Sequence, residues 1–262
     1  MSDDLLRGLY VAVTRPVDQA VSINESITHH GGHVISYPLL AIAPLEDYQV
    51  FEQAISQLGR VDWAIFISSN AVENAMPRII SKFGKVPENL KFAAIGHQTA
   101  KALSLYGIHN VLIPHSRFDS ESLLALPEMH DVANRNVFIF RGEGGRDVLA
   151  DTLKSRGATV TFAECYRRVN PQNDTQPLTD AWQQGQLNAI IITSSEAMRN
   201  LLTMAKESKW LHHVTFCVNH ARIAELPLQL GFKVMVTEAP GDDAMIQCLT
   251  KLILSKVVHL NG

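Results

Sequence analysis

The chain carries the same sequence pattern twice, and this internal repeat restricts its fold more than any other feature. Three pairs of segments align in the same order: residues 9–34 with 137–160, 68–71 with 194–197, and 93–107 with 216–231. Within them, matched residues such as Arg15 and Arg141, or Ser68 and Ser194, are 126 residues apart, and Gly107 and Gly231 are 124 apart. This period is far longer than the roughly 20–50 residues of solenoid repeats, so the pattern predicts a duplicated domain.

Each half of the repeat alternates short apolar segments with longer amphipathic ones. Strands that alternate with helices form parallel sheets with helices on both faces. Gly31, Gly107, Gly157 and Gly231 lie where helices should end in a left-handed residue, and Pro16 suits the first turn of a helix. A chain of 262 residues can bury two cores, so we expect two similar α/β domains.

Two extended segments are candidates for the connection between the domains. SYPLLAIAPL, residues 36–45, and AECYRRVNP, residues 163–171, both contain proline and occupy matching places in the repeat. We expect them to pair as a two-stranded hinge.

Composition excludes several classes of function. The formal net charge is −3, so no overall basic surface attracts nucleic acid or an anionic membrane. Asp3 and Asp4 stand where a secretory signal needs basic residues, and no apolar run is long enough to span a bilayer. The three cysteines are widely spaced and odd in number, which suits a reducing compartment. We expect a cytoplasmic protein.

Four predicted strand ends carry small polar residues that lead into helices. They are Ser68-Ser69-Asn70, Gly96-His97-Gln98-Thr99, Thr193-Ser194-Ser195 and Asn219-His220. Ligands of open parallel sheets bind beyond the carboxyl ends of the strands. These residues can serve as helix caps alone, or the helix N-termini can also bind carboxylates or phosphates. Four such ends around one cleft would suit a polyanion.

Signals for a nucleotide, a metal or a nucleophilic triad are weak. RGEGGRD, residues 141–147, begins a dinucleotide-binding pattern, but Asp147 replaces the third glycine and would repel a pyrophosphate. His29 and His33 are separated by two glycines that break the helix their spacing needs, and no Cys or carboxylate cluster completes a metal site. The nucleophile motif G-x-S-x-G is missing from the sequence. We therefore expect neither a nucleotide nor a metal.

Tyr166 lies in the second extended segment, followed by Arg167 and Arg168. One interpretation is a connecting strand with exposed cations. The other is a phenol donor that faces a cleft between the domains, and the residues alone leave both open.

Several motifs together resemble the uroporphyrinogen-III synthase (HemD) family. They are VTRP at 13–16, FISSNAVENA at 66–75, AAIGHQTAKAL at 93–103, RGEGGRDVLADTLKSRGATV at 141–160, ECYRR at 164–168, ITSSEAMRNL at 192–201 and GDDAMIQCL at 241–249. Each motif is modest, but they follow the order of the family over almost the whole chain.

The resemblance implies two flavodoxin-like α/β domains, joined by a two-stranded β-ladder. Domain 1 would be discontinuous, with residues 1–37 and 172–262, and domain 2 would comprise residues 38–171. Members of the family are generally cytoplasmic monomers without a cofactor, and their product lies between the domains.

The resemblance also implies a reaction. Its substrate, hydroxymethylbilane, carries eight carboxylates, loses its terminal hydroxyl to give an azafulvene, and closes through a spiro intermediate with ring D inverted. Tyr166 matches the tyrosine usually proposed as proton donor. The expected substrate-binding residues are Arg15, Ser68, Ser69, Asn70, Thr99, Arg141, Gly142, Ser194, Ser195 and His220.

His220 departs from the common family pattern and is interpreted as a cap in preference to a proton donor. A transient contact with the upstream deaminase is a further expectation. The alternative from a different class is a non-catalytic two-domain binding protein for a small polyanion.

Overall fold

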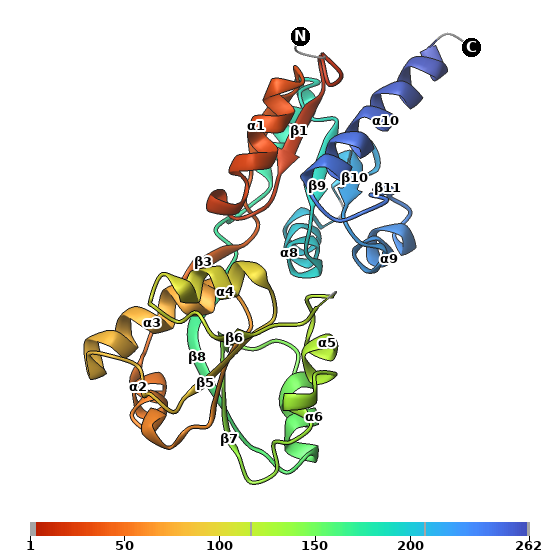
Figure 1. Ribbon diagram of the computed structural model, residues 1–262. Coiled ribbons are helices and arrows are strands. Elements are labelled where there is room, and N and C mark those ends of the chain that lie inside the picture. Colours follow the sequence, from red (N-terminus) through yellow and green to blue (C-terminus); the bar gives the residue numbers. More distant parts are fainter. Residues whose placement is uncertain (1–3, 116, 207, 261–262) are drawn as a thin grey trace. The chain divides into compact units, whose positions relative to one another are not determined.

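A computed structural model describes residues 4–115, 117–206 and 208–260, and the chain forms two compact units (Figure 1). Unit 1 combines both chain ends, Met1–Ala41 and Val169–Gly262, whereas unit 2 is the continuous segment Ile42–Arg168. The chain therefore passes between the units twice. Each unit is built around its own sheet.

The sheet of unit 1 has five strands in the order β11-β10-β9-β1-β2. Their bounds are Tyr10–Val13 (β1), His33–Ser36 (β2), Ala189–Ile192 (β9), Thr215–Val218 (β10) and Lys233–Val236 (β11). Every neighbouring pair is parallel. The central strands are buried on both faces, which explains why they are continuous apolar runs rather than alternating ones.

Helices cover both faces of this sheet. They are α1 (Val21–His29), α7 (Gln176–Gln183), α8 (Ser195–Ala205), α9 (Ala221–Gln229) and α10 (Asp242–Leu260), with short 3-10 helices η1 (Val17–Gln19) and η4 (Lys209–His212). Because strand side chains alternate in direction, Val11 and Val13 pack in the core with α1 and α10, and Ala12 packs with α8 and α9.

Unit 2 has a six-stranded sheet in the order β3-β8-β7-β4-β5-β6. The bounds are Ala41–Ala43 (β3), Trp63–Phe66 (β4), Lys91–Ala94 (β5), Val111–Leu112 (β6), Asn136–Gly142 (β7) and Thr159–Val169 (β8). The pairs from β8 to β6 are parallel. A register shift between Arg141 and Gly142 brings Gly142 opposite Tyr166.

The helices of unit 2 also form two layers. Their bounds are Gln49–Ile55 (α2), Ser69–Phe83 (α3), His97–Ser104 (α4), Ser120–Leu124 (α5) and Val148–Ser155 (α6), with 3-10 helices Leu58–Arg60 (η2) and Pro127–Met129 (η3). One core contains residues of α2, α3 and α4, and the other contains residues of α5 and α6.

These observations confirm the prediction of a mixed α/β fold with parallel sheets. Gly31, Gly107, Gly157 and Gly231 have φ angles of +80°, +77°, +86° and +77°, as expected for residues that end helices. The placement of Pro16 was wrong. Pro16 has an extended backbone with ψ of 142° and precedes η1 instead of entering the first helical turn. No helix of the described ranges combines the length and apolar character needed to cross a bilayer.

Candidate functional site

In unit 2, the turn from β4 into α3 presents a serine pair at the carboxyl end of the sheet. Ser68 is the N-cap residue, and its Oγ accepts a hydrogen bond from the Ala71 amide at 3.1 Å. Ser69 and Asn70 form the first turn of α3 and are half-buried. Thus one serine caps the helix, while its neighbours lie beside backbone N–H groups that lack helical partners.

Tyr166 joins this serine. Its hydroxyl lies 3.2 Å from Ser68 Oγ, and the tyrosine side chain is buried, with the residue only 3% exposed. The ring lies directly over Gly142 of the neighbouring strand. A Cβ atom at position 142 would come within 2.6 Å of Tyr166 Cε2. Glycine at this position therefore allows the ring to lie across β7 and reach the start of α3.

Arg141 is buried and bonded within its own loop. Its Nη1 donates to Asp147 at 2.9 Å, its Nη2 donates to the Gly144 carbonyl, and its Nε donates to the Gly142 carbonyl at 3.2 Å. The guanidinium also lies over the Phe162 ring at 4.4 Å. In this structure the arginine thus holds the shape of the loop that follows β7, and its binding of substrate stays a prediction.

The glycine-rich loop is shaped by the same contacts. Gly144 and Gly145 have φ angles of +65° and +110°, which other residues rarely adopt. The Gly144 amide donates to Glu164 at 3.0 Å, so this carboxylate is bonded to the loop. Asp147 likewise pairs with Arg141.

At the end of β5, Gly96 is the N-cap residue of α4 and carries no side chain that could cap. Thr99, in the first turn, is buried with 5% of its surface exposed. His97 is exposed and packs edge-on against Phe118, with 4.9 Å between the ring centres. The exposed polar side chains at this helix start are therefore those of His97 and Gln98 rather than that of Thr99.

In unit 1, the turn from β9 into α8 repeats the arrangement around β4. Ser194 Oγ accepts a hydrogen bond from the Ala197 amide at 3.0 Å, and Ser195 begins the helix. At the end of β1, Arg15 Nη1 lies 2.6 Å from Asp242 Oδ1, and 15% of the arginine side chain is exposed. Asp242 is the first residue of α10, where its negative charge interacts favourably with the positive end of the helix dipole.

His220 occupies the N-cap position of α9, but within the described structure its side chain makes no capping hydrogen bond. The interpretation of this histidine as a cap is therefore wrong. An imidazole is longer than the hydroxyl or carboxylate groups that reach back to the first turn, and this one is exposed. Its role in binding substrate stays a prediction.

Two further polar residues lie near these strand ends and are not part of the predicted binding set. Asp242 was overlooked although an acidic residue at a helix start is a recognisable signal. Asn219, after β10, has a buried Oδ1 with no hydrogen-bond partner among the residues described. No pattern in the sequence indicates that this oxygen lacks a donor.

The predicted site residues thus form two sets. Unit 2 brings Tyr166, Ser68 and Gly142 into contact, with Arg141 in the adjoining loop. Unit 1 holds Arg15, Ser194, Ser195 and His220 at the ends of β1, β9 and β10. Helix N-termini in both sets can bind carboxylates. Within the described part, no three His, Cys, Asp or Glu residues gather to hold a metal ion.

Comparisons with known proteins agree on one family. The family model described as "Uroporphyrinogen-III synthase HemD" matches residues 21–247. The uroporphyrinogen-III synthase of Escherichia coli is 30% identical over 91% of this chain and 99% of that protein. The enzyme of Synechococcus elongatus is 31% identical over 76% of each chain.

Solved structures show the same fold. A mutant uroporphyrinogen III synthase from Thermus thermophilus superposes with a TM-score of 0.65 at 18% identity, covering 95% of this chain and all of that one. The enzyme from Helicobacter pylori has a TM-score of 0.58 at 17% identity, with 94% and 99% covered.

Proposed function

The chain belongs to the uroporphyrinogen-III synthase family, and on this premise we propose that it closes hydroxymethylbilane to uroporphyrinogen III in haem biosynthesis. The reaction makes the protein a lyase that acts on a small molecule. The observation that carries this conclusion is the family match, which spans residues 21–247 and so includes Tyr166 and the serine pairs of both units.

We propose the following course for the reaction. The terminal hydroxyl of the substrate accepts a proton and leaves as water, which produces an azafulvene. The substituted carbon of ring D attacks it to form a spiro intermediate, which fragments and recloses with ring D inverted. Holding the substrate in the curled geometry can contribute about 7–11 kcal/mol of barrier reduction, and a placed proton donor can add about 10²–10⁴-fold in rate.

Tyr166 is the proposed proton donor, and its contacts support this role. Ser68 Oγ already accepts the Ala71 amide, so its own proton can be donated to the Tyr166 oxygen 3.2 Å away. That arrangement leaves the phenol proton free for the departing hydroxyl. Gly142 provides the space that fixes the ring in position.

The carboxylates of the substrate are proposed to bind at the helix starts marked by the serine pairs, Ser68-Ser69 and Ser194-Ser195. Backbone N–H groups and the positive end of the helix dipole favour anions at these places. Arg15 is proposed to bind a carboxylate in exchange for Asp242, whose ion pair with it is partly exposed. Asn70, Thr99, Arg141, Gly142 and His220 complete the proposed binding set.

We also propose that the two units descend from an internal duplication and are joined by a two-stranded ladder. Three pairs of strands support the duplication, because the first residues of the two strands in each pair are 126 residues apart. The pairs of first residues are Tyr10 and Asn136, His33 and Thr159, and Trp63 and Ala189. The position of β3 beside β8 supports the ladder. The proposed domain boundaries lie at residues 37/38 and 171/172.

The enzyme is further proposed to be a cytoplasmic monomer that receives its substrate from the upstream deaminase. All three cysteines are free and buried, as suits a reducing compartment. A direct transfer would limit spontaneous closure of the linear tetrapyrrole. Light scattering of the purified protein, alone and with the deaminase, tests both the monomer and the contact.

The function itself is tested by supplying hydroxymethylbilane to the purified protein and separating the oxidised porphyrin isomers. We expect isomer III, formed faster than spontaneous closure. Isomer I alone, at the spontaneous rate, would contradict the proposal. Tight binding of the porphyrinogen without turnover would instead identify a binding protein.

A further inference from the structure

We propose that Cys217 and Cys248 form a reactive dithiol in unit 1, which hydrogen peroxide converts to a disulfide. This modification site is independent of the proposed synthase chemistry. It rests on the position of both thiols in one core between α10 and β10, on a small cavity that reaches one of them, and on the charge beside that cavity.

The two cysteines come from different elements and meet in one core. Cys217 lies in β10 and is fully buried, and Cys248 lies in α10 with 4% of its surface exposed. Both belong to the cluster that α1 and α10 form against the sheet. Because α10 packs against β10 and the Cys217 side chain is close enough to act on the Cys248 thiol, we infer that the two sulfur atoms are neighbours before any oxidation.

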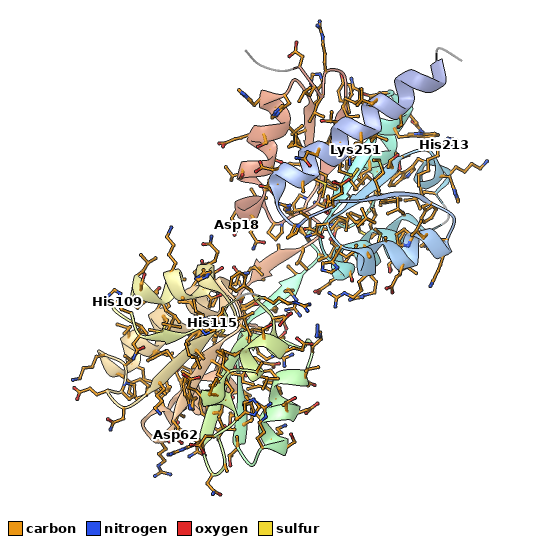
Figure 2. The ribbon with its side chains drawn as sticks, turned by 45° about the vertical axis from the view of Figure 1, so that its right-hand side comes forward. Asp18, Asp62, His109, His115, His213 and Lys251 are labelled. Carbon is orange, nitrogen blue, oxygen red and sulfur yellow. The ribbon has the colours of Figure 1, made fainter. Side chains whose placement is uncertain are left out.

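A small cavity gives access to Cys248. It has a volume of about 30 Å³ and is lined by residues of β11, the following loop and α10, including Glu238, Gln247, Cys248 and Lys251. A cavity of roughly 10–15 Å³ already admits a water molecule, so this one has room for hydrogen peroxide. Lys251, which Figure 2 labels on α10, forms an ion pair with Glu238 at the same cavity.

The electrostatic surroundings favour reaction at Cys248. The hydrogen bond from Cys217 lowers the pKa of the Cys248 thiol, and the Lys251 charge lowers it further against the opposing effect of burial. The thiolate is the nucleophilic form of cysteine. Cys217 therefore assists first as a hydrogen-bond partner and then as the second thiol.

Cys165 provides an internal contrast. It is fully buried in unit 2, and burial raises the pKa of its thiol to about 12. Its sulfur lies 3.3 Å from the Arg141 carbonyl oxygen and 3.5 Å from that of Ala71. A thiol in this environment stays protonated and unreactive at neutral pH.

The oxidation takes place in two balanced steps. The Cys248 thiolate attacks one oxygen of hydrogen peroxide, the O–O bond breaks, and the departing hydroxide takes up a proton to become water. This step leaves a sulfenic acid on Cys248. The Cys217 sulfur then attacks the oxidised sulfur, the S–S bond forms, and the hydroxyl leaves with the thiol proton as a second water molecule.

The test uses the intact protein, treated with hydrogen peroxide at neutral pH, quenched, denatured and alkylated before peptide mapping. We expect the loss of two hydrogen atoms, a linked pair of peptides containing Cys217 and Cys248, and one alkylated cysteine, Cys165. Three alkylated cysteines would overturn the proposal, and so would further oxidation of Cys248 while Cys217 remains a thiol.

Variants separate the roles of the two thiols. Cys217→Ser should stop the reaction at a Cys248 sulfenic acid that dimedone traps, whereas the control Cys165→Ser should still form the disulfide. Lys251→Gln should slow oxidation several-fold. If Cys217→Ser does not fold, the mapping of the native protein decides alone. A disulfide that includes Cys165 would contradict the assignment.

Discussion

At the scale of single residues, the absent side chain of Gly142 determines where a tyrosine can lie. The Tyr166 ring occupies the space that a Cβ atom would need, and its hydroxyl thereby reaches Ser68. An alanine at position 142 would have to displace a buried aromatic ring, because a contact of 2.6 Å is far below ordinary separations. The glycine thus positions the proposed proton donor.

Replacing Tyr166 by phenylalanine tests this donor. Tyr166→Phe keeps the ring over Gly142 but removes the proton that would accompany the departing hydroxyl, so we expect turnover to fall by roughly 10–100-fold. Steady-state kinetics with separation of porphyrin isomers measures the effect. Tyr106→Phe, at the end of α4, is the matched control and should leave turnover unchanged. Equal kinetics of Tyr166→Phe and the original protein would remove Tyr166 from the mechanism.

Two buried acids should make the protein lose stability in alkaline solution. Burial is the main cause that raises the pKa of Tyr37 from 10.0 to about 12 and that of Cys165 from 9.0 to about 12. The lower value of each pair applies to the unfolded chain and the higher value to the folded chain. At a pH between the two, the unfolded chain has released protons that the folded chain retains, so the free energy of unfolding decreases as pH rises.

The expected loss is roughly 2 kcal/mol or more between pH 9 and 12, since one pKa unit corresponds to about 1.4 kcal/mol. Denaturant unfolding at a series of pH values measures it. Tyr37→Phe should weaken the dependence above pH 10 but not the part due to Cys165. A free energy of unfolding that stays constant from pH 9 to 12 would contradict the prediction.

At the scale of elements, adjacent residues of each serine pair have different roles: the first serine caps the helix, and the second is proposed to bind substrate. Ser68 and Ser194 cap α3 and α8, so replacing either by alanine should lower the free energy of unfolding by about 1 kcal/mol. Ser69→Ala and Ser195→Ala should change stability little but raise KM. Denaturation curves and steady-state kinetics together distinguish the capping serines from the serines proposed to bind substrate.

Ser68→Ala should additionally reduce turnover, because this serine contacts Tyr166, whereas Ser194→Ala, which lies in the other unit, should leave turnover at saturating substrate unchanged. The division of roles is wrong if Ser195→Ala destabilises the protein as much as Ser194→Ala does.

The elements that the sequence predicts well are those defined by local signals. Buried parallel strands are continuous apolar runs, and glycines such as Gly31 and Gly157 end helices because they adopt positive φ angles. Contacts between distant segments leave no such signal. Nothing local places Tyr166 over Gly142, or brings Cys217 and Cys248 into one core.

Individual side chains were harder to assign for a related reason. Position at a strand end shows that a residue can reach a ligand, but not which group it binds within the protein. Arg141 is bonded to its own loop and Arg15 to Asp242, 227 residues away in the chain. Competition among partners of similar chemistry is decided by tertiary packing.

At the scale of the whole molecule, the predicted sequence repeat and the compact units of the structure divide the chain differently. The sheet of unit 1, taken as β2-β1-β9-β10-β11, has the same order as β8-β7-β4-β5-β6 in unit 2. Yet β1 and β2 belong to the first repeat, whereas β9, β10 and β11 belong to the second. Under the proposed duplication, each unit therefore combines strands from both repeats, and neither repeat contains a complete sheet.

This arrangement predicts how fragments of the chain behave. Residues 42–168 contain β4 to β8 and both cores of unit 2, so this fragment should fold alone with a single cooperative transition. Residues 9–135 have the same length and contain one repeat, but they lack β7, the strand that lies between β8 and β4. That fragment would leave the apolar strand β4 unpaired on one side, and we expect it to aggregate or remain without fixed packing.

Both fragments are tested by circular dichroism during denaturant unfolding, which measures cooperativity, and by hydrogen exchange, which measures the protection of individual amides. Protected amides in β4 and β5 are expected in the fragment 42–168 but not in the fragment 9–135. If the fragment 9–135 folds as cooperatively as its counterpart, the repeat would be the folding unit. In that case each repeat would be stable by itself. The shared strand order of the two sheets would then reflect only the proposed duplication, and it would not show which segments must be present together for folding.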